Sequence, residues 1–138
     1  MCWSMWKSFI AKFQEEPKSD DTVETSFGTF FKEDNEWLGE KRRNGQTLSV
    51  TIQDAQGAPR IAFLDKLPAL LEQLPLLEQK VRRELSNVTD KHELYNLLDE
   101  QTDVVDFVLG FSYEEEYWSE TVFVDVKEEQ IVGWTTVD

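Results

Sequence analysis

Strict alternation of apolar and polar side chains over residues 46–53 is the feature that most constrains this fold. Leu48, Val50 and Ile52 alternate with threonine and serine, which is the period of a strand with one buried face. Asn44-Gly45 directly precedes this run, and that pair favours a two-residue hairpin because both turn positions need positive φ. Residues 25–31, 36–43 and 46–53 are therefore predicted to form a three-stranded antiparallel meander.

A leucine-rich run follows at residues 61–86, with apolar positions three and four residues apart. This spacing predicts helix, and Pro68 and Pro75 each remove a backbone donor. We therefore expect two helices that meet near Pro75. Asp90 and Glu93 fit a capping box, which predicts a further short helix ending near Glu100.

The final third returns to strand patterns at residues 104–113, 120–126 and 130–136, with a turn at 127–129. These runs predict a second antiparallel three-stranded meander. The expected fold class is α+β: an N-terminal amphipathic helix, a three-stranded meander, two to three helices and a second three-stranded meander. Residues 1–16 would hold the N-terminal helix, 17–24 a polar connector and 25–138 a single domain.

The first 14 residues carry an aromatic stripe. At about 100° per residue, their apolar side chains fall within an arc of roughly 160°; they are Trp3, Met5, Trp6, Phe9, Ile10 and Phe13. We expect this stripe to pack on the domain's own sheet. Docking across a homodimer, binding of another partner and adsorption to a membrane surface are the alternatives.

Charge is unevenly distributed along the 138 residues. The chain has a formal net charge of −14, and residues 93–138 hold 13 acidic side chains against one basic one, Lys127. This charge argues against direct binding of nucleic acid, whose affinity comes from neutralised phosphates. It favours encounter with a cationic surface, although acids on solvated strand faces could serve solubility alone.

Two further absences in the sequence narrow the classes of protein. Cys2 is the only cysteine, so no internal disulfide or four-thiolate metal site is available. No apolar run is long enough to span a membrane, and Lys7 and Lys12 interrupt the start. We expect a cytoplasmic protein.

Residues suited to catalysis do not form a recognisable motif. His92 is the only histidine, and we expect it to be exposed or to make a local capping contact. Asp99, Asp103 and Asp106 would align only if helix continued through them, and the acidic segments lack the alternation and central glycine of a calcium loop. We therefore predict a protein that is not an enzyme, with no cofactor, no metal and no catalytic residue.

Residues 112–119 read Ser-Tyr-Glu-Glu-Glu-Tyr-Trp-Ser and combine aromatic anchors with dense negative charge. Tyrosine and tryptophan commonly form the energetic centre of an interface, and carboxylates orient a basic partner. The predicted partner-binding residues are Tyr113, Glu114, Glu115, Glu116, Tyr117, Trp118 and Glu120. The alternative is an exposed hairpin whose aromatic side chains fold back on the core.

The order of elements, with Phe27-Gly-Thr-Phe30 opening a strand and residues 121–126 and 130–133 forming the last two, resembles small acidic bacterial domains of uncharacterised function. Some members of such families are immunity proteins that block toxins. The resemblance implies a protein that binds and occludes a basic partner, such as a toxin that acts on an anionic substrate. The alternatives are a small-ligand-binding or regulatory domain and a DNA mimic.

Overall fold

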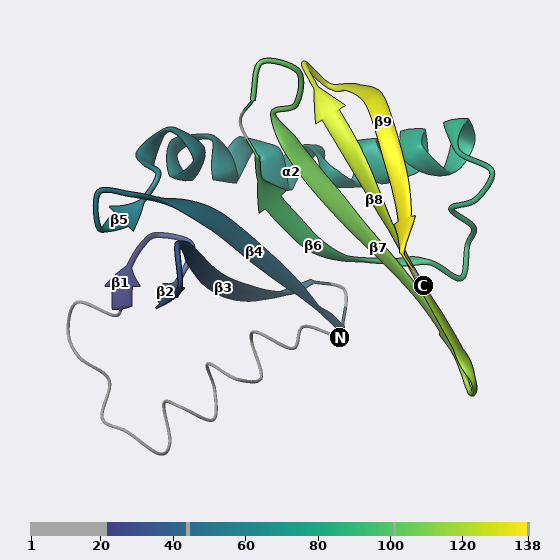
Figure 1. Ribbon diagram of the computed structural model, residues 1–138, viewed down its shortest axis with the longest axis horizontal. Coiled ribbons are helices and arrows are strands. Elements are labelled where there is room, and N and C mark those ends of the chain that lie inside the picture. Colours follow the sequence, from purple (N-terminus) through teal and green to yellow (C-terminus); the bar gives the residue numbers. More distant parts are fainter. Residues whose placement is uncertain (1–21, 44, 101, 138) are drawn as a thin grey trace.

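The computed structural model describes residues 22–43, 45–100 and 102–137. In this part of the chain, nine strands form one sheet and one helix crosses it (Figure 1). The strands are β1 (Thr22–Glu24), β2 (Thr29–Glu33), β3 (Glu36–Arg43), β4 (Gln46–Ala55), β5 (Ala58–Pro59), β6 (Glu93–Asp99), β7 (Phe107–Glu115), β8 (Trp118–Lys127) and β9 (Gln130–Val137). The helix is α2 (Ile61–Glu84).

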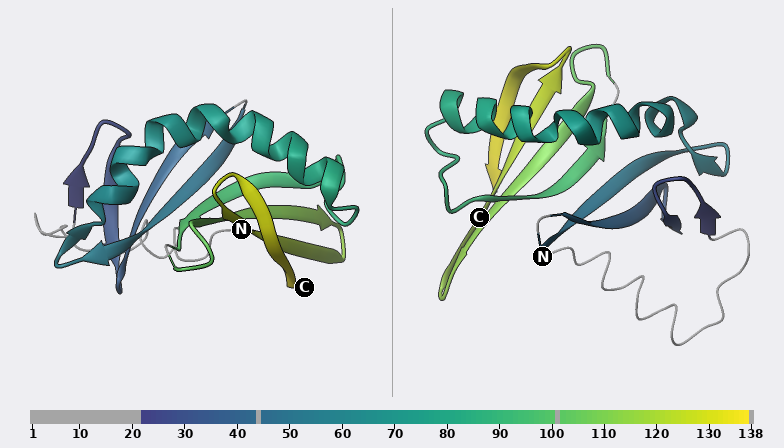
Figure 2. Two further views of the ribbon diagram at one scale, coloured as in Figure 1. Left: turned by 90° about the horizontal axis from the view of Figure 1, so that it is seen from above. Right: turned by 180° about the vertical axis from the view of Figure 1, so that it is seen from behind.

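The sheet joins two antiparallel meanders side by side. Its order is β1-β2-β3-β4-β6-β7-β8-β9, and the short β5 pairs with β4 outside this path. The pairing of β4 with β6 is parallel, whereas the other pairings are antiparallel. Parallel neighbours need a crossover connection, and α2 supplies it, lying across both meanders on one face of the sheet (Figure 2).

The core lies between α2 and this inner face of the sheet. Six side chains of the helix are buried at alternating spacings of four and three residues: Phe63, Leu67, Leu70, Leu74, Leu77 and Val81. They belong to one cluster with inward-facing residues of both meanders, among them Trp37, Val50, Leu97 and Val124. One helix face therefore ties the two halves of the sheet together.

The expected α+β class is wrong. The described chain is mostly β, with a single helix and a single sheet, not a segregated arrangement with two to three helices between two three-stranded meanders. The predicted N-terminal helix, residues 1–16, lies outside the described residues, as does most of the connector. Residues 22–24, at the end of that connector, form β1.

The predicted break of the helix near Pro75 does not occur. α2 runs continuously through Pro68 and Pro75, which are both exposed and, seven residues apart, share the outer side of the helix. A curved helix is convex toward solvent, so carbonyls left without a donor on that side can bind water. Figure 2 shows α2 arching over the sheet, a shape that these prolines favour.

The short helix predicted after Asp90 is the strand β6. It lies in the middle of the sheet between β4 and β7, with Leu94 and Leu97 buried toward the core and Asn96 buried on the other face. A strand buried on both faces has a nearly continuous apolar sequence, and over seven residues this cannot be told from a helix by period. The second meander therefore has four strands.

The other strand predictions are confirmed with shifted ends. β3 and β4 are joined across the predicted Asn44-Gly45 turn, and Gly45 has φ of +80°. β7, β8 and β9 correspond to the last three predicted strands. The first predicted strand, residues 25–31, corresponds to β2, which starts four residues later than predicted. The reason is that Thr25 and Gly28 close a turn between β1 and β2.

Candidate interaction site: the β7–β8 projection

The β7–β8 hairpin extends beyond both neighbouring strands (Figure 1). β6 pairs with β7 only as far as Ser112, and β9 pairs with β8 only from Thr121 onward. Beyond these positions residues 113–120 continue as a two-stranded ribbon, with the turn at Glu116 and Tyr117. We call residues 113–120 the β7–β8 projection; it holds all seven predicted partner-binding residues.

The register divides these residues between two faces and a tip. Tyr113 pairs with Glu120 and Glu115 with Trp118, so these four side chains share the face on which α2 lies. Glu114 lies on the opposite face, and Glu116 and Tyr117 form the tip. The structure therefore brings Tyr113, Glu115, Trp118 and Glu120 together and separates them from Glu114, Glu116 and Tyr117.

Aromatic contacts stiffen the base of the projection. The ring of Tyr113 lies 5.1 Å from that of Trp118 in an edge-on arrangement and 5.3 Å from that of His92. Such pairs add to the stabilisation from buried area alone. A two-stranded ribbon is marginally stable by itself, so these contacts explain how the projection keeps its shape.

His92 is buried, contrary to the expected exposure, although the expected local contact is present. The backbone N–H of Thr89 donates to Nδ1 of His92 at 3.0 Å. Nδ1 therefore acts as an acceptor, which places the ring proton on Nε2, 3.0 Å from Oε1 of Glu120. This bond fastens β8 to the loop that precedes β6.

Lys91 adds a positive charge at the same place. Its ammonium lies 5.7 Å from the centre of the Tyr113 ring and 4.0 Å from a Glu115 carboxylate oxygen. The hydroxyl of Tyr113 donates to that carboxylate, and this hydrogen bond raises the pKa of Tyr113. Lys91 thus offsets one of the three consecutive glutamates.

The loop that carries Lys91 and His92 is held by α2. Arg82 donates from its guanidinium to the carbonyl oxygens of Thr89 at 2.6 Å and of His92 at 2.9 Å. The same guanidinium lies 5.7 Å from the ring centre of Phe111 on β7. The projection is therefore anchored to the last turn of the helix.

Side chains at the tip are turned to solvent. Tyr117 is 92% exposed and Trp118 is 47% exposed, and Glu114, Glu115 and Glu116 are exposed as well. The alternative, in which the aromatic side chains fold back on the core, describes Tyr113 but not Tyr117. An exposed tyrosine among carboxylates can bind a basic surface through one apolar anchor and several charge-assisted hydrogen bonds.

Sequence reasoning missed Lys91 and His92, which complete the base of this site. Both follow Asp90 in the stretch interpreted as a capping box. If residues 93–99 are instead a strand paired with β7, Glu93 lies opposite Ser112 and His92 comes beside Tyr113. The sequence signal that could have revealed them is the run of apolar residues in β6, which buries side chains on both faces of the sheet.

The aspartates considered for their spacing serve separate structural roles. Asp99 binds Arg60, Asp106 binds Lys127 at 3.1 Å and the backbone N–H of Glu128 at 2.9 Å, and Asp103 is exposed. The hydrogen bond from the backbone N–H of Glu128 and the one from Lys127 lower the pKa of Asp106. Within the described ranges no group of three or more histidine, cysteine or carboxylate side chains is placed to hold a metal ion.

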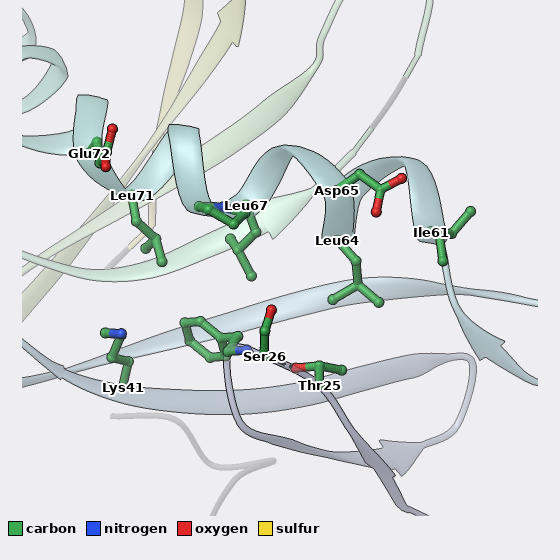
Figure 3. Close-up of a pocket in the computed structure, with 11 residues that line it drawn as sticks. Thr25, Ser26, Lys41, Ile61, Leu64, Asp65, Leu67, Leu71 and Glu72 are labelled. Carbon is green, nitrogen blue, oxygen red and sulfur yellow. Dashed lines mark hydrogen bonds between the residues drawn. The ribbon is translucent and has the colours of Figure 1, made fainter.

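A pocket of about 520 Å³ lies elsewhere, between α2 and the first meander (Figure 3). Leu64 and Leu71 point from the helix toward the strands, and Lys41 approaches from β3. Its lining residues are Thr25, Ser26, Phe27, Lys41, Ile61, Leu64, Asp65, Leu67, Pro68, Leu71 and Glu72. The volume is within the range of small-molecule sites.

Comparisons with protein-family models, with curated proteins and with solved structures gave no match. The described part of the chain contains no helix of the length and apolarity needed to cross a membrane.

Proposed function

We propose that this chain is an acidic interaction protein that binds and occludes a basic protein partner through the β7–β8 projection. The observation that carries the proposal is the two-stranded ribbon that extends past β6 and β9 and holds Tyr117, 92% exposed, at its tip. A narrow ribbon fits a cleft in the partner, where it blocks access by other molecules.

The chemistry of the tip selects the partner. Glu114, Glu115 and Glu116 are exposed beside Tyr117, and Lys91 lies 4.0 Å from a carboxylate oxygen of Glu115. Complementary charges accelerate encounter and exclude acidic partners. A protein that itself acts on an anionic substrate, such as a nuclease toxin, has a cleft of the required charge, and the resemblance to immunity proteins points to the same class.

The acidic residues of the final third do not form one surface, and this provides a matched control. Glu114 and Glu116 lie at one end of β8, whereas Glu128 and Glu129 lie in the turn at its other end. Replacing either pair with glutamine removes two negative charges. A difference between the two variants therefore reports on position and not on net charge.

The test is affinity capture from the cells that produce the protein, with low-salt and high-salt washes and mass spectrometry of the retained proteins. The unchanged chain should retain one basic protein that is lost as salt rises. Glu114→Gln with Glu116→Gln should slow its association, and Tyr117→Ala should weaken binding by about tenfold or more. Glu128→Gln with Glu129→Gln should bind as the unchanged chain does. Capture of no basic protein, or equal binding by all variants, would overturn the proposal.

The pocket favours a second candidate, the binding of a small ligand with an apolar body. A ligand bound only to the folded state raises Tm by mass action. A thermal-shift screen of metabolites should find a compound that stabilises the protein, and Leu64→Trp, which fills the pocket, should abolish the shift. Leu76→Trp on the exposed side of α2 is the control and should retain it; a screen without a shift would reject this candidate.

A further inference from the structure

The face of the sheet opposite α2 carries a row of mainly apolar side chains. Side chains that are neighbours across the strands form two adjacent rows on this outer face. The first row is Phe31, Leu38, Thr51, Leu98, Val108 and Asp125, and the second is Glu40, Ser49, Asn96, Gly110 and Phe123. A solvated face of an antiparallel sheet carries mainly polar side chains, and the first row, which contains four apolar residues, does not fit that pattern.

Burial on the outer face is also greater than an open sheet allows. Leu38 is 3% exposed and Val108 is 8% exposed, although α2, the helix that the structure describes, lies on the other side (Figure 2). The outer face thus has the properties of a second core layer.

Polar atoms on the same face point to the chemistry of the cover. The side-chain oxygen Oδ1 of Asn96 is buried and has no hydrogen-bond partner in the described chain, and Asn96 is 8% exposed. Leaving a buried acceptor unsatisfied is costly. Its neighbours across the strands are Ser49 on β4 and Gly110 on β7, and the rings of Tyr95 and Phe123 pack close to Gly110.

We propose that residues 3–13 of this chain form the cover, with the aromatic stripe packed on the outer face and an indole N–H from Trp3 or Trp6 donating to Asn96. Indole is a donor without an acceptor, so it matches an orphaned carbonyl oxygen. The stripe also supplies apolar side chains to cover Leu38, Leu98 and Val108.

The connecting chain is long enough. Residues 14–21 can span roughly 26 Å when extended, and four strand spacings from β1 to β6 amount to about 19 Å. A helix over residues 3–13 is about 16 Å long and crosses three to four strands. The stripe can therefore reach Leu98 on β6 from the start of β1 at Thr22.

Charge on the two surfaces is complementary. Lys7 and Lys12 border the stripe, one on each side of its arc. Glu40 and Asp125 lie toward opposite margins of the apolar rows, on β3 and β8. Lysines at these positions can bury their stems on the sheet and place their ammonium groups near the carboxylates.

The test is a double-mutant cycle read out by Tm. Phe9→Ala and Leu98→Ala each remove the same contact, the one between Phe9 and Leu98. The Tm shift of the double variant should therefore be smaller than the sum of the two single Tm shifts. Phe9→Ala combined with Leu76→Ala, which is 70% exposed on α2, is the matched control and should be additive. Additivity in both cycles would overturn the proposal.

Hydrogen exchange of the unchanged chain keeps the test independent of how the variants fold. Backbone amides of residues 3–13 should be protected, and Asn96→Ala should reduce that protection. Exchange at the unprotected rate would refute docking by this segment. Analytical ultracentrifugation tests whether a second copy of the chain covers the face instead. A dimer, together with a double-mutant coupling that weakens on dilution, would assign the face to a second copy and overturn intramolecular packing.

Discussion

Asp99 is a buried charged residue that is held by several hydrogen bonds. Its side chain is fully buried, accepts a hydrogen bond from Nε of Arg60 at 2.8 Å and one from the backbone N–H of Gln53 at 3.2 Å. The second guanidinium contact with Asp99 makes the pair bidentate. This pair joins the end of β6 to β4 and to the residue before α2, so it fixes where the crossover begins.

Removing the carboxylate breaks the bidentate pair with Arg60 and leaves the backbone N–H of Gln53 without this acceptor. Asp99→Ala is expected to lower the free energy of unfolding by about 3 kcal/mol, since breaking a pair whose carboxylate is fully buried is strongly destabilising. Urea denaturation measures the change. Asp103→Ala, at an exposed carboxylate nearby, should change it by less than about 0.5 kcal/mol. Equal stability of the two variants would contradict this role.

Glu36 is a partly buried carboxylate that lies among other carboxylates. Burial raises its pKa above the ordinary 4.5, and three neighbouring carboxylates add to the rise: Glu33, Asp34 and Glu100. Because the folded pKa is the higher one, the ionised side chain destabilises the folded state at neutral pH. Protonation relieves this penalty as pH falls through the raised pKa toward 4.5.

Glu36→Gln should therefore raise Tm at pH 7, and the gain should shrink as pH falls and vanish below about pH 4.5. Thermal unfolding from pH 4 to pH 8 measures it. Glu116→Gln, at an exposed glutamate in the tip of the projection, removes an equal charge from a chain of net charge −14 and corrects for general repulsion. A gain no larger than that of the control at pH 7 would show that the local cluster has no effect.

At the scale of elements, α2 shows that a proline need not end a helix. Pro75 lies on the outer side of the arch, and its cost relative to alanine in a helix interior is about 3 kcal/mol. Part of this is offset because proline also restricts the unfolded chain. Pro75→Ala should therefore raise the free energy of unfolding by about 1–2 kcal/mol in urea denaturation. Gln79→Ala should leave it within about 0.5 kcal/mol, and destabilisation by Pro75→Ala would show that the arch depends on the proline.

Strands with alternating apolar and polar residues were predictable, whereas β6 was not. β4 is marked by alternation and by a turn that requires positive φ, both of which are local signals. β6 gains its stability from pairing with β4, more than 40 residues earlier, and its sequence alone satisfies a helical period equally well. The interpretation of residues 93–99 as helix also hid the base of the projection, because His92 comes beside Tyr113 only when β6 is a strand.

At the scale of the whole molecule, the two meanders share a short pairing and a long helix. The parallel contact between β4 and β6 comprises Ser49 with Asn96, Val50 with Leu97 and Thr51 with Leu98. By contrast α2 packs its buried face on both meanders. Cooperative unfolding therefore depends on the helix more than on the strand pairing at the centre.

Leu74 lies in the middle of that buried face and is 0% exposed. Leu74→Ala leaves a cavity and should lower the free energy of unfolding by about 3 kcal/mol. Because one helix serves both halves, hydrogen exchange should show equal loss of protection in β3 and β4 and in β7 and β8. Loss confined to one meander would mean that the halves unfold separately and that the projection is held by its own meander alone. Leu76→Ala, on the exposed side of the helix, should leave protection unchanged in both.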